Sequence, residues 1–169
     1  MGIMSFIKEA GQKLFGHAET EAVAQQAQAA PDNSELLAKV AEANQTAGTA
    51  IEAYIASQNL TADGLAVAFD GATQTATVTG QAADQATKEK ILLCCGNVQG
   101  VSQVNDLLTV EAPADESQFH VVARGDTLSA IAKTYYGNAG QYPKIFEANR
   151  PMLSHPDKIY PGQMLRIPA

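Results

Sequence analysis

The chain of 169 residues has room for one ordinary domain or two small ones. Its 18 acidic and 11 basic side chains give a net charge of −7. This charge argues against a nucleic-acid-binding protein, because binding to phosphates depends on basic side chains. No apolar run approaches the roughly 18 residues that a membrane-spanning helix needs, so we expect a soluble protein.

Apolar residues in the first 17 positions recur at the spacing of one helix face. They are Ile3, Phe6, Ile7, Ala10, Leu14 and Phe15. This spacing predicts an amphipathic helix over residues 3–15, within an N-terminal segment of residues 1–17. We expect the helix to pack on the folded part of the chain. A membrane-surface anchor is the alternative, although Lys8 and Lys13 are few cations for that role.

The N-terminus lacks the pattern of an exported protein. No basic segment precedes an apolar core and no small-residue cleavage site follows one, so we expect no secretory signal. The two cysteines, Cys94 and Cys95, are adjacent, and neighbouring residues rarely form a relaxed disulfide. Both features favour a cytoplasmic protein. We expect the cysteines to be small core residues, with binding of a soft metal as the alternative.

Alanine, glutamine and glutamate dominate residues 18–44, with a break from Pro31 to Ser34. Alanine and glutamine favour helix, while the apolar stripe over residues 36–43 is weak. A firmer stripe over residues 51–60 predicts a packed helix, and Gly48 separates the two. We therefore expect an alanine-rich helical spacer that leads into a folded domain.

The next segments alternate apolar and polar residues, as half-buried strands do. Residues 65–69 and 75–79 flank the turn signal Asp70-Gly71, and they predict a β-hairpin. Residues 84–95 then predict a helix, with Gly96 as its C-terminal glycine.

A third strand over residues 101–110 completes a domain of residues 45–111, and a polar linker of residues 112–118 follows. Helix, hairpin, helix and strand in this order resemble the BON domain. The residues that carry the resemblance are Leu65-Ala66-Val67, Thr77-Val78-Thr79-Gly80, Lys88-Glu89-Lys90-Ile91, Gly96-Asn97-Val98-Gln99-Gly100-Val101 and Val104-Asn105-Asp106. The resemblance implies a module that binds lipid or other partners and has no catalytic residues.

The last part of the chain predicts a strand, two helices and a strand. An apolar strand over residues 119–122 leads into a turn, and Asp126 is expected to cap a helix that ends at Gly137. A second helical face over residues 142–149 ends before Pro151, because the residue preceding a proline disfavours the helical conformation. A turn and a closing strand follow.

This order resembles the LysM domain over residues 119–169. The residues that carry the resemblance are Gly125-Asp126-Thr127-Leu128, Ile131-Ala132, Ile145, Asn149, Ile159-Tyr160-Pro161-Gly162-Gln163, Leu165 and Ile167-Pro168. LysM modules bind N-acetylglucosamine polymers such as peptidoglycan or chitin. The resemblance implies a shallow groove formed by Gly125, Asp126, Thr127, Leu128, Pro151, Met152 and Leu153. The alternative is that these residues only cap a helix and close a small core.

Charge is distributed unevenly between the two parts of the chain. The segment 119–168 has six basic and three acidic side chains, a charge of +3, which leaves −10 for the rest. Opposite charges could favour docking of the two domains.

One BON domain followed by one LysM domain resembles a family of bacterial potassium-binding proteins over nearly the full chain, apart from the alanine-rich insertion. The N-terminal sequence Phe6-Ile7-Lys8-Glu9-Ala10-Gly11 contributes to this resemblance. It implies cytoplasmic binding of K⁺, with backbone oxygens of Ile7, Ala10, Gly96, Val98 and Val101 as ligands.

The chemistry of potassium permits such a site. Neutral backbone carbonyls can replace the hydration shell of this large, weakly charged ion, whereas carboxylate clusters suit calcium or magnesium. The loop 96–101 has glycines near both ends, and the end of the predicted N-terminal helix offers free carbonyls at the negative end of its dipole. The alternative is a helix end and a tight turn without an ion.

We therefore predict an α+β protein of two small domains, BON-like (α-β-β-α-β) and LysM (β-α-α-β), with an N-terminal amphipathic helix and an alanine-rich helical insertion. The predicted function is potassium binding, as a monovalent-cation sensor or buffer that becomes compact when K⁺ binds. The main alternative is a peptidoglycan-binding protein, and a third is a stress-related scaffold for a protein or membrane partner. We expect a monomer and no enzyme, and the separated His17, His120 and His155 argue against a zinc site.

Overall fold

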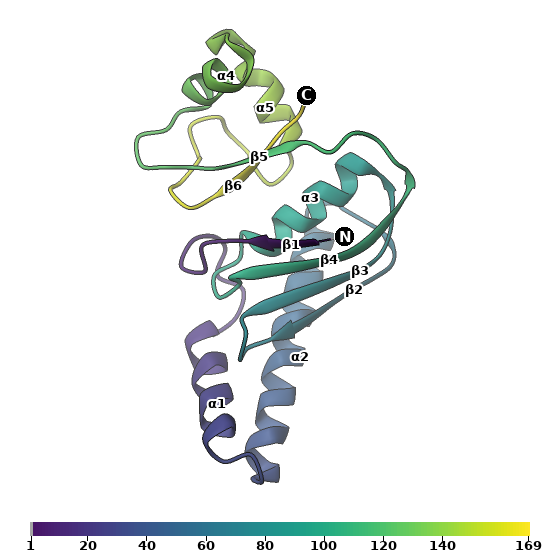
Figure 1. Cartoon of the computed structure of the whole chain (residues 1–169), viewed down its shortest axis with the longest axis vertical. Helices are drawn as coiled ribbons and strands as arrows, with labels where there is room; N and C mark the ends of the chain where they lie inside the picture. Colours follow the sequence, from purple (N-terminus) through teal and green to yellow (C-terminus); the bar gives the residue numbers. More distant parts are fainter. Residues whose placement is uncertain (1) are drawn as a thin grey trace.

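The computed structural model describes residues 2–169, so Met1 of the predicted N-terminal segment lies outside the described residues. Figure 1 shows a sheet covered by helices, a helical hairpin that extends beyond it, and a smaller C-terminal unit. The elements in chain order are β1 (Gly2–Ser5), α1 (His17–Ala29), α2 (Ser34–Ser57), β2 (Asp63–Asp70), β3 (Thr75–Asp84), α3 (Gln85–Gly96), β4 (Gln103–Ala112), β5 (Gln118–Val121), α4 (Leu128–Tyr136), η1 (Ala139–Gln141), α5 (Tyr142–Ala148) and β6 (Met164–Ile167).

The larger sheet has the strand order β1-β4-β3-β2. The predicted hairpin is confirmed, because β2 and β3 are antiparallel and Val67 lies opposite Val78. Helix α3 carries the chain across the sheet, so that β4 runs parallel to β3. The crossover ends in the loop that precedes β4, and this loop forms part of the site described below.

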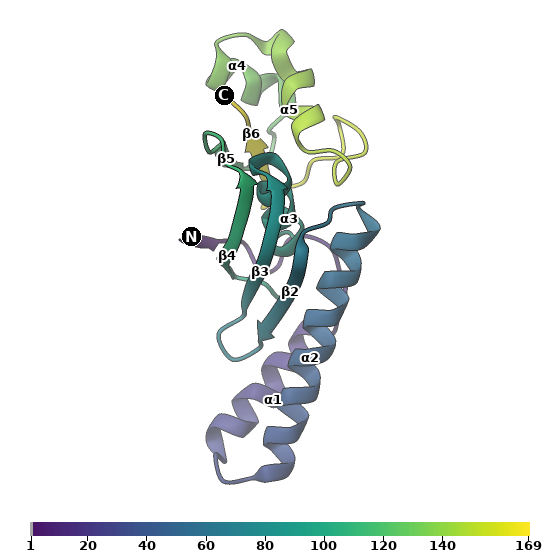
Figure 2. The same cartoon turned by 90° about the vertical axis from the view of Figure 1, so that its right-hand side faces the viewer.

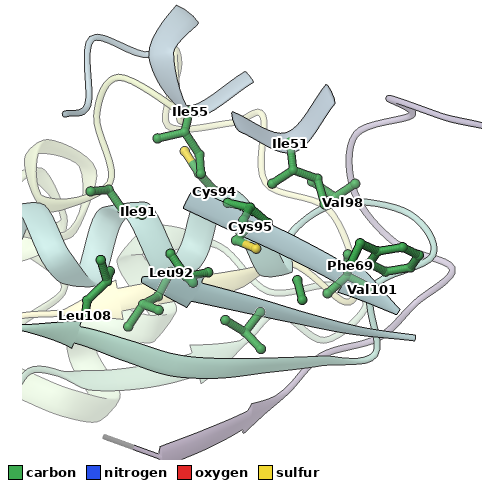
Figure 3. Close-up of a cluster of buried hydrophobic side chains, with 14 of the residues drawn as sticks. Ile51, Ile55, Phe69, Ile91, Leu92, Cys94, Cys95, Val98, Val101 and Leu108 are labelled. Atoms are coloured by element: carbon green, nitrogen blue, oxygen red, sulfur yellow. The ribbon is translucent and has the colours of Figure 1, made fainter. Parts of the chain in front are cut away.

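The core of this domain lies between the sheet and the helices α2 and α3. Its fully buried side chains include Ile51 and Ile55 of α2, Ile91 and Cys95 of α3, and Val98 of the following loop. Figure 3 shows these side chains together with the labelled Val101. The loop after α3 is thus anchored in the core by its own side chains.

The predicted N-terminal helix over residues 3–15 is wrong. Residues 2–5 form β1, which pairs antiparallel with the edge of β4. Met4 packs against the core while Ile3 is 68% exposed, which is the alternation of a strand. The free N–H and C=O groups along the edge of β4 account for the difference, because pairing with them outweighs a helical preference that only the apolar spacing suggested.

The alanine-rich insertion is helical, as predicted, and forms a hairpin of α1 and α2 that projects beyond the sheet (Figure 2). Asn33 caps α2 by accepting hydrogen bonds from Glu35 N and Leu36 N. Gly48, which separates the two predicted apolar stripes, does not interrupt the helix, and α2 continues through it. A Cβ at this position would lie 2.5 Å from Val67 O, so the glycine allows the helix to approach β2 closely.

The C-terminal unit has the predicted order of elements, with β5 and β6 antiparallel. Gly137 ends α4 in the left-handed conformation at φ 72°. Asp126 does not cap this helix. Thr127 does, by accepting a hydrogen bond from Ala130 N, while Asp126 accepts hydrogen bonds from Ala123 N and His120. Within residues 2–169, none of the helices is long and apolar enough to cross a membrane.

Candidate functional site

Two loops that are distant in sequence lie side by side at the end of α3. We call residues 6–12 the N-terminal loop and residues 97–102 the α3–β4 loop. Their main chains are joined by four hydrogen bonds. These are Phe6 N to Ser102 O at 2.8 Å, Gln12 N to Asn97 O at 2.9 Å, Gln99 N to Gln12 O at 2.9 Å, and Gly100 N to Lys8 O at 2.7 Å. The structure therefore brings together the two segments that the sequence suggested as sources of ligands.

Glycines allow the close approach of the two loops. Gly11 has φ 108°, and a Cβ there would lie 2.9 Å from Val98 N and nearer still to the carbonyl of Asn97. Gly100 has φ 96° and lies beneath the side chain of His17. A Cβ on Gly96 would overlap the ring of Phe6.

The five predicted ligand residues all lie in or beside this junction. Ile7 and Ala10 form a turn in which Ile7 O accepts from Ala10 N at 3.0 Å, and Val98 O accepts from Val101 N at 3.1 Å. Gly96 is the last residue of α3. The negative end of a helix dipole does lie at the junction, but it belongs to α3 and not to the predicted N-terminal helix.

Charged side chains surround the junction without converging on it. Lys8 Nζ lies 3.3 Å from Glu21 and 3.8 Å from Glu9, and His17 lies 3.9 Å from Glu9. Among the described residues, no group of three or more His, Cys, Asp or Glu side chains could hold a metal ion.

The C-terminal unit docks directly on the junction. The amide of Asn97 donates to Met164 O at 2.9 Å and accepts from Met164 N at 2.9 Å. Gly162, in the turn before β6, packs against Ala10 and Ile7. No sequence pattern indicated the roles of Asn97 and Gly162, because a polar loop residue and a turn glycine are common in any protein.

A second contact between the two units involves a buried carboxylate. Glu89 of α3 is 2% exposed and binds Arg166 Nε of β6, Gln85 Nε2 at 3.1 Å and Ser117 N at 2.8 Å. Burial alone would raise the pKa of Glu89, but the hydrogen bonds from Arg166, Ser117 and Gln85 outweigh it and hold the pKa below its usual range. Opposite charges on the two units therefore meet in this interface.

The seven residues of the predicted glycan groove have different surroundings. Gly125 is open, with nothing within 4 Å of a Cβ built on it. Leu128 and Leu153 are buried in the core of the C-terminal unit. Met152 packs against the core of the larger domain, and Pro151 follows Arg150 through a cis peptide bond.

Part of that groove faces the other domain. Met152 and Leu153 line a cavity of 190 Å³ between the two units, together with Tyr54, Asn97 and Tyr160. Burial raises the pKa of Tyr160 to about 12, so its hydroxyl stays protonated at neutral pH.

The two cysteines are buried core residues. Burial raises the pKa of Cys94 to about 12 and raises that of Cys95 as well. Both thiols are neutral at physiological pH, and a neutral thiol is a poor ligand and nucleophile.

Comparison with known proteins gives matches to both domains and to the whole chain. Residues 44–112 match the BON domain and residues 120–168 match the LysM domain. The potassium binding protein Kbp of Escherichia coli O6:H1 strain CFT073 is 45% identical over 168 residues, which cover 99% of each chain. An uncharacterized protein of Deinococcus radiodurans is 51% identical over 50 residues, which cover 30% of this chain and 19% of that protein.

Proposed function

This chain belongs to the family of the potassium binding protein Kbp, and we propose that it binds K⁺ at the junction of the N-terminal loop and the α3–β4 loop. The ligands in this proposal are backbone carbonyl oxygens of Ile7, Ala10, Gly96, Val98 and Val101. The chain is a binding protein and not an enzyme, as its BON and LysM domains indicate.

The main-chain contact between the two loops supports this proposal most strongly. It joins residues 6, 8 and 12, which flank residues 7 and 10, to residues 97–102 without using any charged side chain. Val98 and Val101 are both fully buried, so their side chains anchor the α3–β4 loop beside the N-terminal loop. Neutral backbone oxygens near one another suit K⁺, because they can replace its hydration shell.

The proposal includes a change in shape. The LysM domain contacts the same loops through Asn97 and Gly162, so an ion that orders the loops favours the docked arrangement. The protein would then act as a potassium sensor or buffer that is compact when loaded. Two unpaired cysteines support a reducing compartment, and we place the protein in the cytoplasm on that basis.

If backbone carbonyls hold the ion, carboxylates near the junction should contribute little to the affinity for K⁺. Replacing Glu9 with glutamine should change the dissociation constant for K⁺ by less than about fivefold, since an exposed charge contributes about 1 kcal/mol or less. The side chain of Glu9 is 69% exposed. Calorimetric titration of the variant with KCl checks this, and a loss of binding in Glu9→Gln would show that a carboxylate, and not carbonyls alone, holds the ion.

Peptidoglycan binding remains the alternative function, supported by the LysM match and by the open turn at Gly125. The docked arrangement of the domains argues against peptidoglycan binding, because three residues of the predicted groove are covered. Leu128 and Leu153 are core residues, and Met152 faces the BON domain. Retention of the protein on purified peptidoglycan would favour this alternative.

A further inference from the structure

We infer that the side-chain amide of Asn97 couples potassium binding to docking of the LysM domain. This inference rests on the proposed function, because it concerns how the occupied site is communicated to the second domain. In this role Asn97 is a positioning residue and not a ligand.

The amide of Asn97 satisfies both main-chain groups of Met164, the first residue of β6. Nδ2 donates to Met164 O and Oδ1 accepts from Met164 N, each at 2.9 Å. This pair of hydrogen bonds requires one orientation of the amide plane, so it forms only when the backbone of Asn97 is correctly placed. The contact is therefore sensitive to the conformation of the α3–β4 loop.

The main chain of Asn97 connects α3 and the N-terminal loop at the same point. Its N–H donates to Leu93 O at the end of α3, and its carbonyl accepts from Gln12 N of the N-terminal loop. The proposed ligand oxygen of Gly96 belongs to the peptide group that contains the N–H of Asn97, and that of Val98 belongs to the peptide group one residue further along the chain. An ion bound to both would restrict the backbone on both sides of Asn97, and with it the direction of its side chain.

A second contact links the LysM domain to the other half of the site. A Cβ on Gly162 would lie 2.7 Å from Ala10 Cβ and 3.5 Å from Ile7 Cβ, so this turn touches both N-terminal residues whose carbonyls are proposed ligands. The turn itself is held within the LysM domain, because Gly162 N donates to Val122 O at 2.8 Å. The domain therefore contacts both loops of the site at once.

The hydrogen bonds of Asn97 stabilise the docked LysM domain only weakly in the absence of an ion. Asn97 lines the 190 Å³ cavity between the domains, which also has the polar side chains of Gln12 and Gln163 on its walls. Water in such a cavity can replace the amide contact, so the net contribution of each hydrogen bond to docking is small. A contact of this strength can be made or lost according to whether the loop is ordered.

The test compares three full-length variants with the unmodified protein. Asn97→Ala removes the amide, and Asn97→Asp keeps an acceptor for Met164 N but places a carboxylate against Met164 O. Gln99→Ala is the matched control, because its amide lies in the same loop but donates to Glu9 O, within the N-terminal loop. Calorimetry measures K⁺ binding, and small-angle scattering measures the radius of gyration with and without saturating K⁺.

Coupling through Asn97 predicts that Asn97→Ala and Asn97→Asp still bind K⁺ saturably but show less than half of the contraction of the unmodified protein. The added charge in Asn97→Asp should leave K⁺ affinity equal or higher, which damage to the loop would not produce. Gln99→Ala should contract fully at saturation.

Two results would overturn the coupling role. The first is full contraction in both Asn97 variants, and the second is loss of K⁺ binding in both, which would make the residue part of the site itself. If the unmodified protein does not bind K⁺, the proposed function fails instead, and the two failures are thereby distinguished.

Discussion

Replacing Gly11 with alanine will weaken potassium binding by roughly tenfold or more, although the change adds a single methyl group. The new Cβ would lie 2.9 Å from Val98 N and closer to the carbonyl of Asn97, which are backbone atoms that no side-chain rotation can move away. The φ of 108° adds strain of about 1–3 kcal/mol, and 1.4 kcal/mol corresponds to a factor of ten. The N-terminal loop must therefore move, together with the carbonyls of Ile7 and Ala10.

Calorimetric titration with KCl measures this effect. Gly2→Ala is the matched control, since a Cβ at Gly2 meets nothing within 4 Å. We expect the control to bind K⁺ as the unmodified protein does. Unchanged affinity in Gly11→Ala would mean that the N-terminal loop supplies no ligands to the ion.

Replacing Glu89 with glutamine will separate the two domains and destabilise the folded protein. The carboxylate is almost completely buried, and its loss leaves the guanidinium of Arg166, only 13% exposed, without a countercharge. Breaking a buried ion pair on one side costs about 3–5 kcal/mol. Denaturant unfolding should report this loss, and scattering should show an expanded molecule even in saturating K⁺.

Glu147→Gln provides the control for a surface pair. Glu147 lies 3.3 Å from Arg150, and both side chains are more than half exposed. The expected loss of stability is about 1 kcal/mol or less. If Glu89→Gln lowers the free energy of unfolding as little as this control does, the Glu89–Arg166 contact does not hold the domains together.

The same carboxylate gives the interface a dependence on pH. The pKa of Glu89 is lowered in the folded protein despite its burial, because Arg166, Ser117 and Gln85 donate to the charged form. Its contribution to stability is therefore present above the unfolded pKa of about 4.3 and is lost as the pH falls through the folded value. Acidification below about pH 4 should loosen the docked domains, and Glu89→Gln should lack this component.

Local signals in the sequence predicted much of the fold. The strand alternation around Asp70-Gly71 and the helix end at Gly137 depend on residues close in sequence, and both are confirmed. Asp84, the first residue of the predicted helical stretch, caps α3 by accepting from Thr87 N at 2.7 Å. In the two domains these local preferences agree with the tertiary structure, which is why pattern analysis succeeded there.

Long-range contacts explain what the sequence did not predict. Residues 3–15 have the spacing of a helix, but an open edge of β4 lies 100 residues further along the chain and pairs with β1. The contact between Asn97 and Met164 likewise depends on the docking of one domain on the other. Backbone carbonyl ligands also leave no side-chain pattern, so the proposed potassium site could be suggested only from a whole-chain resemblance and the conformational freedom of glycines.

In the proposed mechanism, potassium binds at the loop junction and draws the domains together. The most direct measurement titrates the potassium-free protein with KCl and, separately, with NaCl at constant ionic strength, and follows heat by calorimetry and the radius of gyration by small-angle scattering. We expect saturable heat and contraction with K⁺ and neither with Na⁺. Absence of saturable heat with K⁺, or equal contraction with both salts, would rule out a potassium-specific site that draws the domains together.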